Sequence, residues 1–149
     1  METQTTSHSP KRTIALGRTI GRQLKGGEVI AIVGPLASGK THLTKGIAMG
    51  AGAPDPKGVN SPTFVIINQY AGRLDIYHID AYRLESVADF EMLGFDDLCY
   101  PESVVLIEWA DKVEPAIRAT NPMRIELDHA GPDARTIRLY NAPEYINVR

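Results

Sequence analysis

The chain has 149 residues, of which 43% are apolar and 23% charged, and its 18 acidic and 16 basic residues give a formal net charge of −2. A chain of this length buries about 70% of the surface that its unfolded form exposes, which suits one domain. The composition excludes a disordered, collagen-like or disulfide-rich chain, and the charge balance argues against holding nucleic acid by bulk electrostatics alone. The single cysteine, Cys99, cannot form an internal disulfide, which favours a reducing cytosol.

Residues 1–12 are polar and rich in Ser and Thr, without the apolar segment of a secretory signal. Apolar runs such as 29–33 and 104–107 are far shorter than the ~20 residues that a membrane-spanning helix needs. We therefore expect a cytoplasmic protein with no membrane partner. The expected organisation is a flexible polar N-terminus over 1–12 and a single domain over 13–149.

The first half of that domain predicts a helix, a strand and a second helix. Residues 13–25 carry Leu16, Ile20 and Leu24 at helical spacing and end at Gly26-Gly27, a pair suited to a left-handed cap. Residues 28–33 are almost continuously apolar, as in a central strand covered on both faces. A glycine-rich break precedes a helix over 42–49.

The second half predicts further strands and short helices. Expected strands cover 63–70 and 74–79, joined as a hairpin at Ala71-Gly72-Arg73, then 103–108, and a closing pair at 123–127 and 136–140. Expected helices cover 85–93 and 111–117. The fold class is α/β: a single P-loop NTPase domain with a mixed, mainly parallel central sheet flanked by helices and an antiparallel hairpin.

Residues 34–41 read Gly-Pro-Leu-Ala-Ser-Gly-Lys-Thr and satisfy G-x-x-x-x-G-K-[ST], the phosphate-binding P-loop pattern. The glycines let backbone N–H groups turn inward around an anion, and the following helix adds its positive amino-terminal end. In such a loop Lys40 reaches the β and γ phosphates, while the Thr41 hydroxyl binds Mg²⁺. The strand before the motif and the helix after it supply the context that the pattern requires.

A P-loop enzyme also needs a carboxylate across the sheet that holds the metal or its waters. Glu108 ends the apolar run of residues 104–107 and supplies one candidate. Asp80 ends an alternating strand and shares the face of Ile76, which makes it a second candidate. A lone histidine in a strand is more often a packed or surface residue than a ligand, and we interpret His78 in that way.

Four blocks together resemble the bacterial TsaE (YjeE) family of P-loop ATPases in tRNA threonylcarbamoyladenosine biosynthesis. The blocks are 34–41, Asn60-Ser61-Pro62-Thr63-Phe64, Tyr77-His78-Ile79-Asp80-Ala81-Tyr82-Arg83-Leu84 and Leu106-Ile107-Glu108-Trp109-Ala110. Their order and spacing match, and the last three blocks are far more specific than a P-loop.

The resemblance implies a weak ATPase that depends on the partner proteins TsaD and TsaB, which carry out the transfer to tRNA. It implies ATP and Mg²⁺ as cofactors, and contact with tRNA only indirectly through the assembly. It assigns catalytic roles to Asp80, Thr63 and Glu108, with Thr63 in a nucleotide-sensitive loop, and metal binding to Thr41 and Glu108. The implied nucleotide-binding residues are Gly34, Pro35, Leu36, Ala37, Ser38, Gly39, Lys40, Thr41, His42 and Trp109.

The loop departs from the usual family sequence at Pro35, Ala37 and Ser38. Pro35 removes one backbone donor, and Ala37 disfavours the left-handed conformations that glycine adopts freely. Two other functions remain open at this point: a nucleotide-dependent binding module with negligible hydrolysis, and a small-molecule phosphotransferase. The latter would need an arginine-rich lid, and Arg83 is the only obvious cation beside the site.

The first predicted helix carries a basic stripe of Arg18, Arg22 and Lys25, opposite its apolar face. A solvated helix face is the simpler interpretation. The alternative is docking to an acidic partner surface or to tRNA phosphates. Three charges are few for holding RNA.

Overall fold

The computed structural model describes residues 2–53 and 67–148, which build a seven-stranded sheet in the order β1-β7-β6-β2-β5-β4-β3. The strands are β1 (Glu2–Ser7), β2 (Val29–Val33), β3 (Ile67–Ala71), β4 (Asp75–Asp80), β5 (Ser103–Glu108), β6 (Met123–His129) and β7 (Arg135–Tyr140). The α-helices are α1 (Pro10–Gln23), α2 (Lys40–Gly50), α3 (Val87–Glu91), α4 (Phe95–Leu98) and α5 (Glu114–Ile117). Short 3₁₀ turns are η2 (Ala81–Arg83), η3 (Ala110–Val113) and η4 (Arg118–Thr120).

The centre of the sheet is parallel and both of its ends are antiparallel. Strand β2 lies between β5 and β6 and runs parallel to both, and β4 continues the parallel set beside β5. At one end β3 pairs antiparallel with β4, and at the other β6, β7 and β1 form antiparallel pairs. This confirms the predicted mixed, mainly parallel α/β sheet, its central strand and its hairpin.

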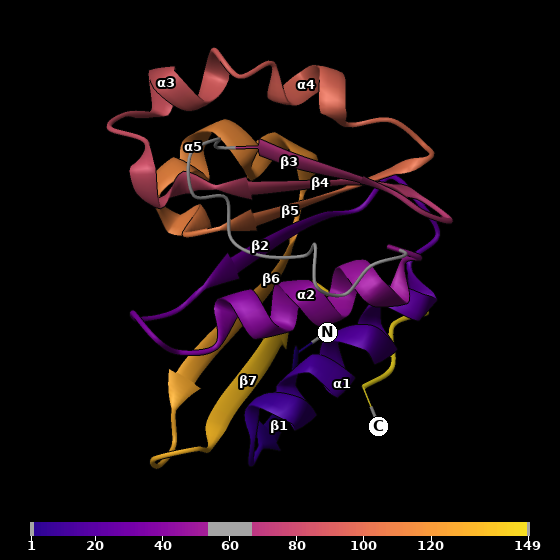
Figure 1. The fold of residues 1–149 in the computed structure, drawn as a ribbon. Coiled ribbons are helices and arrows are strands. Elements are labelled where there is room, and N and C mark those ends of the chain that lie inside the picture. The colour runs from indigo at the N-terminus through magenta and orange to yellow at the C-terminus, as the bar shows by residue number, and fades with distance from the viewer. Residues whose placement is uncertain (1, 54–66, 149) are drawn as a thin grey trace.

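Helices cover both faces of the sheet (Figure 1). Because successive side chains of a strand point to opposite sides, each buried strand contributes to the apolar clusters on both faces. Ile30 and Ile32 of β2 belong to the apolar cluster under α1 and α2. Ala31 and Val33 belong to a second cluster, which includes Phe90 of α3. The continuous apolarity of β2 therefore reflects burial on both faces.

Helices α1 and α2 contact each other backbone to backbone through two pairs of glycines, each spaced four residues apart. A Cβ at Gly21 would lie 2.1 Å from the Ile47 carbonyl oxygen, and one at Gly46 would lie 2.1 Å from the Ile14 carbonyl oxygen. Gly17 and Gly50 meet the opposite backbone in the same way. This close approach fixes α2, and with it the loop that precedes α2, against the rest of the fold.

Of the N-terminal segment that was expected to be flexible, 1–12, the described residues form a strand and the start of a helix. Residues Glu2–Ser7 form β1, which pairs along its whole length with β7. The Ser7 hydroxyl then bonds the Thr13 hydroxyl at 2.7 Å, and Ser9 caps α1 by accepting from the Arg12 N–H. Pro10 suits the first helical turn, so α1 begins at Pro10 and ends at Gln23, which leaves Lys25 beyond the helix.

The short helices also differ from their predicted forms. The helix expected over 85–93 is shorter, since α3 covers only Val87–Glu91. Gly94, left-handed with φ 78°, then precedes α4, a short helix that was not predicted. The helix expected over 111–117 begins as the 3₁₀ turn η3 and continues as α5. Within residues 2–53 and 67–148, no helix combines the length and apolarity needed to cross a lipid bilayer.

We expect Gly21→Ala to lower the free energy of unfolding by about 1–3 kcal/mol, because the added methyl group meets the backbone of α2. Alanine favours an isolated helix by about 1 kcal/mol over glycine, so helix propensity alone gives the opposite sign. Urea denaturation of both proteins measures the difference, with Ala15→Leu at an exposed position of α1 as the control. A variant as stable as the wild type would refute the close helix contact.

Candidate functional site

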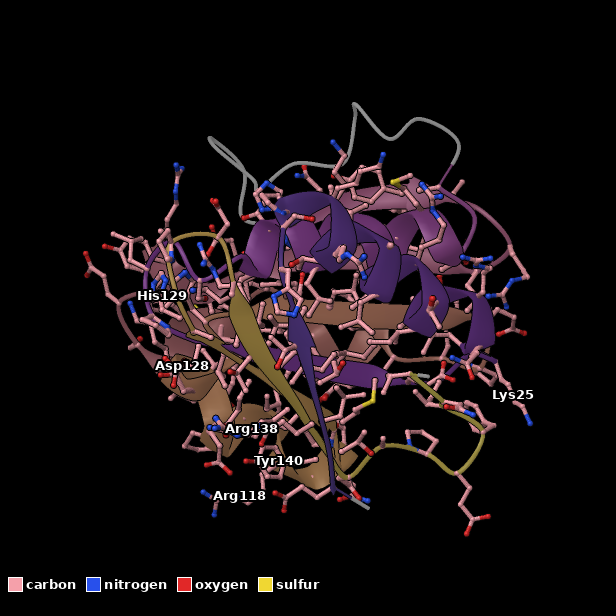
Figure 2. The ribbon with its side chains drawn as sticks, turned by 90° about the horizontal axis from the view of Figure 1, so that it is seen from below. Lys25, Arg118, Asp128, His129, Arg138 and Tyr140 are labelled. Atoms are coloured by element: carbon pink, nitrogen blue, oxygen red, sulfur yellow. The ribbon has the colours of Figure 1, made fainter. Side chains whose placement is uncertain are left out.

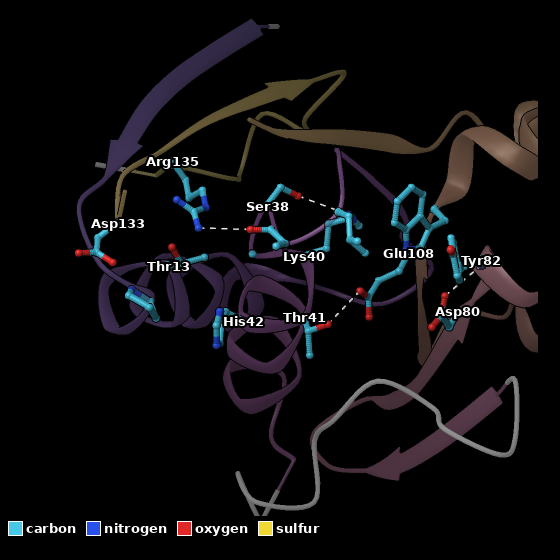
Figure 3. Close-up of a pocket in the computed structure, with 15 residues that line it drawn as sticks. Thr13, Ser38, Lys40, Thr41, His42, Asp80, Tyr82, Glu108, Asp133 and Arg135 are labelled. Atoms are coloured by element: carbon cyan, nitrogen blue, oxygen red, sulfur yellow. Dashed lines mark hydrogen bonds between the residues drawn. The ribbon is translucent and has the colours of Figure 1, made fainter. Parts of the chain in front are cut away.

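A cavity of about 550 Å³ opens at the carboxyl ends of β2, β4 and β5, the edge of a parallel sheet where ligands commonly bind (Figure 3). Three groups of side chains line it: the glycine loop and the start of α2, the ends of β4 and β5, and a group from α1 and the β6–β7 turn. These are Leu36, Ala37, Ser38, Gly39, Lys40, Thr41 and His42; Asp80, Tyr82, Glu108 and Trp109; and Pro10, Thr13, Asp133 and Arg135.

The glycine loop, residues 34–41, connects β2 to α2 and needs its two glycines for different reasons. A Cβ at Gly34 would lie 2.5 Å from the Leu127 carbonyl oxygen, so any side chain there would clash with β6. Gly39 has φ 98°, a left-handed conformation at the cap of α2. The loop therefore brings the amino-terminal end of α2, which begins at Lys40, to the cavity wall.

Ala37 adopts the left-handed conformation that its side chain disfavours, with φ 60°. Side chains of the β6–β7 hairpin bond this part of the loop. The Arg135 guanidinium donates to the Ala37 carbonyl at 3.2 Å, and the His129 Nε2–H donates to the Leu36 carbonyl at 3.2 Å. Figure 2 shows His129 projecting at the end of the hairpin. The hairpin thus compensates for the absence of glycine at position 37.

Lys40 is buried, with 6% of its surface exposed, and its ammonium lies inside the loop. Its Nζ donates to the carbonyls of Gly34 at 2.8 Å and Pro35 at 2.7 Å, and to the Ser38 hydroxyl at 3.3 Å. It also lies 4.0 Å from the centroid of the Trp109 ring. Burial holds the pKa of Lys40 below its ordinary value, although nearby carboxylates, Glu108 first among them, act in the opposite direction.

Glu108, at the end of β5, connects α2 to β4 through its two carboxylate oxygens. Its Oε1 accepts from the Thr41 hydroxyl at 3.2 Å, and its Oε2 lies 2.5 Å from His78 Nε2. Glu108 is 2% exposed, so these contacts replace water around a buried carboxylate. The β4–β5 register pairs Asp80 directly with Glu108, which brings the two predicted carboxylates to the same edge.

Asp80 begins η2 and caps it, accepting at Oδ1 from the Tyr82 N–H at 3.0 Å. Burial raises the pKa of Asp80, and the Glu108 carboxylate raises it further. The hydrogen bond from Tyr82 and the charge of Arg83 offset part of that effect. A carboxylate of this kind is a stronger proton acceptor than a solvated aspartate.

An aromatic pair borders the cavity beside Lys40. The rings of Tyr82 and Trp109 lie 4.9 Å apart between centroids, and Lys112 donates to the Tyr82 carbonyl at 2.7 Å. Trp109 has φ 58°, a left-handed conformation that turns the chain from β5 into η3. Tyr82 remains 55% exposed, so this pair presents an aromatic surface at the mouth of the site.

The structure brings together most residues that the sequence indicated. Of the loop residues 34–41, Gly34 and Pro35 contribute carbonyls to Lys40, and the other six line the cavity with His42, Asp80, Glu108 and Trp109. Thr63 lies outside the described residues. The sequence analysis missed Pro10, Thr13, Tyr82, Asp133 and Arg135, as well as the contact of His78 with Glu108.

The fold and site define an α/β protein with a glycine loop between its central strand and α2, facing two carboxylates on adjacent parallel strands. The chain belongs to the family of threonylcarbamoyl adenosine biosynthesis proteins TsaE, whose model matches residues 7–137. This membership confirms the resemblance found in the sequence. The family's role is in tRNA threonylcarbamoyladenosine biosynthesis.

Individual relatives cover most of the chain. It is 38% identical over 125 residues to the tRNA threonylcarbamoyladenosine biosynthesis protein TsaE of Treponema pallidum, spanning 82% of this chain and 91% of the relative. The Bacillus subtilis protein of the same name is 38% identical over 130 residues, spanning 87% and 79%. A crystal structure of Bacillus subtilis YdiB superposes with a TM-score of 0.75 at 31% identity, covering 93% of this chain and 84% of that one.

We expect Asp80→Asn to raise the thermal midpoint at pH 7, because burial makes the ionised carboxylate costly and asparagine can still accept from Tyr82. The sign follows from a folded-state pKa above the unfolded one. Below the unfolded pKa the carboxyl is protonated in both states and its ionisation costs nothing; the cost grows as pH rises from the unfolded pKa and is fully present above the folded pKa. Thermal scans from pH 3 to pH 7 should show the advantage of the variant growing with pH, whereas exposed Glu144→Gln shows no such trend. A constant difference at every pH would contradict the electrostatic cause.

Proposed function

We propose that the protein binds and hydrolyses ATP with Mg²⁺, as a component of the tRNA N6-threonylcarbamoyladenosine modification machinery. The observation that carries the proposal is the 3.2 Å contact between Thr41 and Glu108, made beside the glycine loop at the start of α2. A hydroxyl and a carboxylate that meet there are the donor pair that a P-loop enzyme uses for its cation.

Phosphate binding follows from the loop and from Lys40. Residues at the start of α2 line the cavity, and the unpaired N–H groups of a helix's first turn, together with its dipole, favour an anion there. The Lys40 ammonium is already desolvated and neighbours the cavity, so a phosphate oxygen can replace one of its carbonyl partners with little movement. Charge-assisted bonds of this kind are about twice as strong as neutral ones.

Thr41 and Glu108 fit a magnesium site, because both offer the ion a hard oxygen ligand. Thr41 Oγ1 and Glu108 Oε1 would hold the ion together with phosphate oxygens, since Mg²⁺ usually takes only one or two protein ligands and keeps several waters. The bound ion would supply neutralisation of the charge that develops on the β and γ phosphates. Glu108 fixes one side of that arrangement from β5.

Hydrolysis requires a group that orients the attacking water, and Asp80 suits this role. Its carboxylate lines the cavity beside Glu108, is held by the Tyr82 N–H, and has a raised pKa that favours proton acceptance. Thr63 is proposed as the residue of the nucleotide-sensitive loop. We assign the nucleoside end of the cavity to the remaining lining residues, Pro10, Thr13, Asp133 and Arg135.

The proposed partners are the TsaD and TsaB proteins, with the threonylcarbamoyl transfer carried out by the partner. Family membership supports this role, since the relatives are named for tRNA threonylcarbamoyladenosine biosynthesis. We propose a cytoplasmic location and contact with tRNA only through the assembly.

We expect Lys40→Ala to weaken ATP binding about 10- to 100-fold, because a charge-assisted contact is worth ~1.5–3 kcal/mol. Nucleotide affinity and single-turnover hydrolysis should be measured with purified protein, alone and mixed with TsaD and TsaB of the same organism. Lys45→Ala, on the same helix but outside the cavity lining, is the matched control. Unchanged binding by Lys40→Ala would refute the phosphate site, and binding without hydrolysis under every condition would favour a binding module.

We expect the protein alone not to hold tRNA stably at about 0.15 M salt, because a few neutralised phosphates give weak, salt-sensitive binding. Arg18 and Arg22 are exposed on α1, and Lys25 lies past its end with its side chain pointing outward (Figure 2). Filter binding tests this. Submicromolar affinity, lost when all three residues are changed to Glu, would make this surface an RNA-binding element.

A further inference from the structure

His78 is a buried histidine on β4 to which the proposed chemistry assigns no role. Only 1% of its surface is exposed, and its Nε2 lies 2.5 Å from Glu108 Oε2. The other ring nitrogen, Nδ1, is also buried and has no hydrogen-bond partner within the part of the chain that the structure describes. The ring therefore makes one polar contact, and that contact is with a proposed metal-binding side chain.

The environment of the ring determines which nitrogen carries its proton. A carboxylate oxygen accepts, so the hydrogen bond to Glu108 requires a proton on Nε2. A second proton on Nδ1 would bury an N–H group that has no acceptor, which is costly. Burying an unprotonated Nδ1 without a donor costs less free energy. The arrangement favours the neutral Nε2–H tautomer, which gives Glu108 a single fixed donor.

The two oxygen atoms of Glu108 thus have separate partners on separate elements. Oε2 meets His78 from β4, and Oε1 meets Thr41 at the start of α2. The strand register pairs His78 with Leu106, two residues before Glu108, so the carboxylate reaches back along the sheet to the ring. With Oε2 held in this way, rotation of the carboxylate away from Thr41 would break the hydrogen bond to His78.

We propose that His78 is a positioning residue, whose Nε2–H holds Glu108 so that Oε1 stays beside Thr41 Oγ1, ready for the cation. The inference rests on the proposed function, because it assigns Glu108 and Thr41 to a Mg²⁺-nucleotide. It predicts that His78 sets how much Mg²⁺ the protein needs, and leaves the affinity for nucleotide without metal almost unchanged. Groups that orient metal ligands typically change metal affinity by 10- to 100-fold when removed.

Two amide variants separate this role from packing. In His78→Gln the side-chain amide reaches about as far as Nε2 and can still donate to Glu108. In His78→Asn the shorter amide reaches about as far as Nδ1 and cannot. Nucleotide affinity is measured for both variants and the wild type in EDTA and across a Mg²⁺ titration, with thermal unfolding to verify that each is folded. A Glu108→Gln background tests whether the two residues act together.

We expect His78→Asn to raise the Mg²⁺ concentration for half-maximal nucleotide binding about tenfold or more. The EDTA affinity should stay close to that of the wild type, and His78→Gln should restore most of the Mg²⁺ response. In the Glu108→Gln background, His78→Asn should have little further effect. Nitrogen NMR of the metal-free wild type should show the Nε2–H tautomer, a measurement that does not depend on any variant folding.

The inference is overturned if both variants shift the Mg²⁺ requirement equally, if neither does, or if the ring carries its proton on Nδ1. A wild-type protein that binds no nucleotide, or binds it without any response to Mg²⁺, would refute the proposed function itself. A Mg²⁺-dependent wild type with an unaffected His78→Asn would refute only the positioning role.

Discussion

Backbone hydrogen bonds between parallel strands pair Ile32 of β2 with Glu108 of β5, and Glu108 with Asp80 of β4. Since β2 ends one residue later, at Val33, the glycine loop begins beside both carboxylates. A shift of one residue in either pairing would turn Glu108 or Asp80 to the opposite face of the sheet. The position of the site is therefore a consequence of strand register, which burial of β2 and β5 on both faces maintains.

Electrostatic balance in the cavity depends on burial as much as on charge. Lys40 is desolvated by the loop that surrounds it, and Glu108 and Asp80 lie close enough to affect its pKa. Each of the three groups makes a hydrogen bond with another group of the protein. Such a preorganised site binds charged groups with little reorganisation, which is the main contribution that proteins make to phosphoryl transfer.

Local sequence patterns were sufficient for the centre of the fold and for most of the site. The apolar run of β2, the glycine spacing of the loop and the strand-terminal positions of Asp80 and Glu108 are short-range signals, and all were predicted. Apart from Tyr82, which lies two residues after Asp80, the site residues that the sequence analysis missed depend on contacts between distant segments. Because β6 runs parallel to β2, its end lies at the same edge of the sheet, and this is what brings Arg135 to the loop.

The N-terminal strand and the partner of His78 were missed for the same reason. Neither the pairing of β1 with β7 nor the bond between His78 and Glu108 has a local pattern, because both require the sheet order. The glycines of α1 and α2 did carry a signal, a spacing of four residues in each helix. That spacing indicates a close helix contact only when both helices are considered together.

The pairing of β1 with β7 joins the first and the last strand in the part of the chain that the structure describes. During synthesis, residues 2–7 are made long before residues 135–140 exist, so β1 cannot join the sheet until β7 has been synthesised. Its polar sequence, Glu-Thr-Gln-Thr-Thr-Ser, suits this delay, because an apolar strand left unpaired for that time would invite aggregation. The edge that β1 occupies therefore rests on a pairing of long sequence separation, the kind of contact that costs most loop-closure entropy to form.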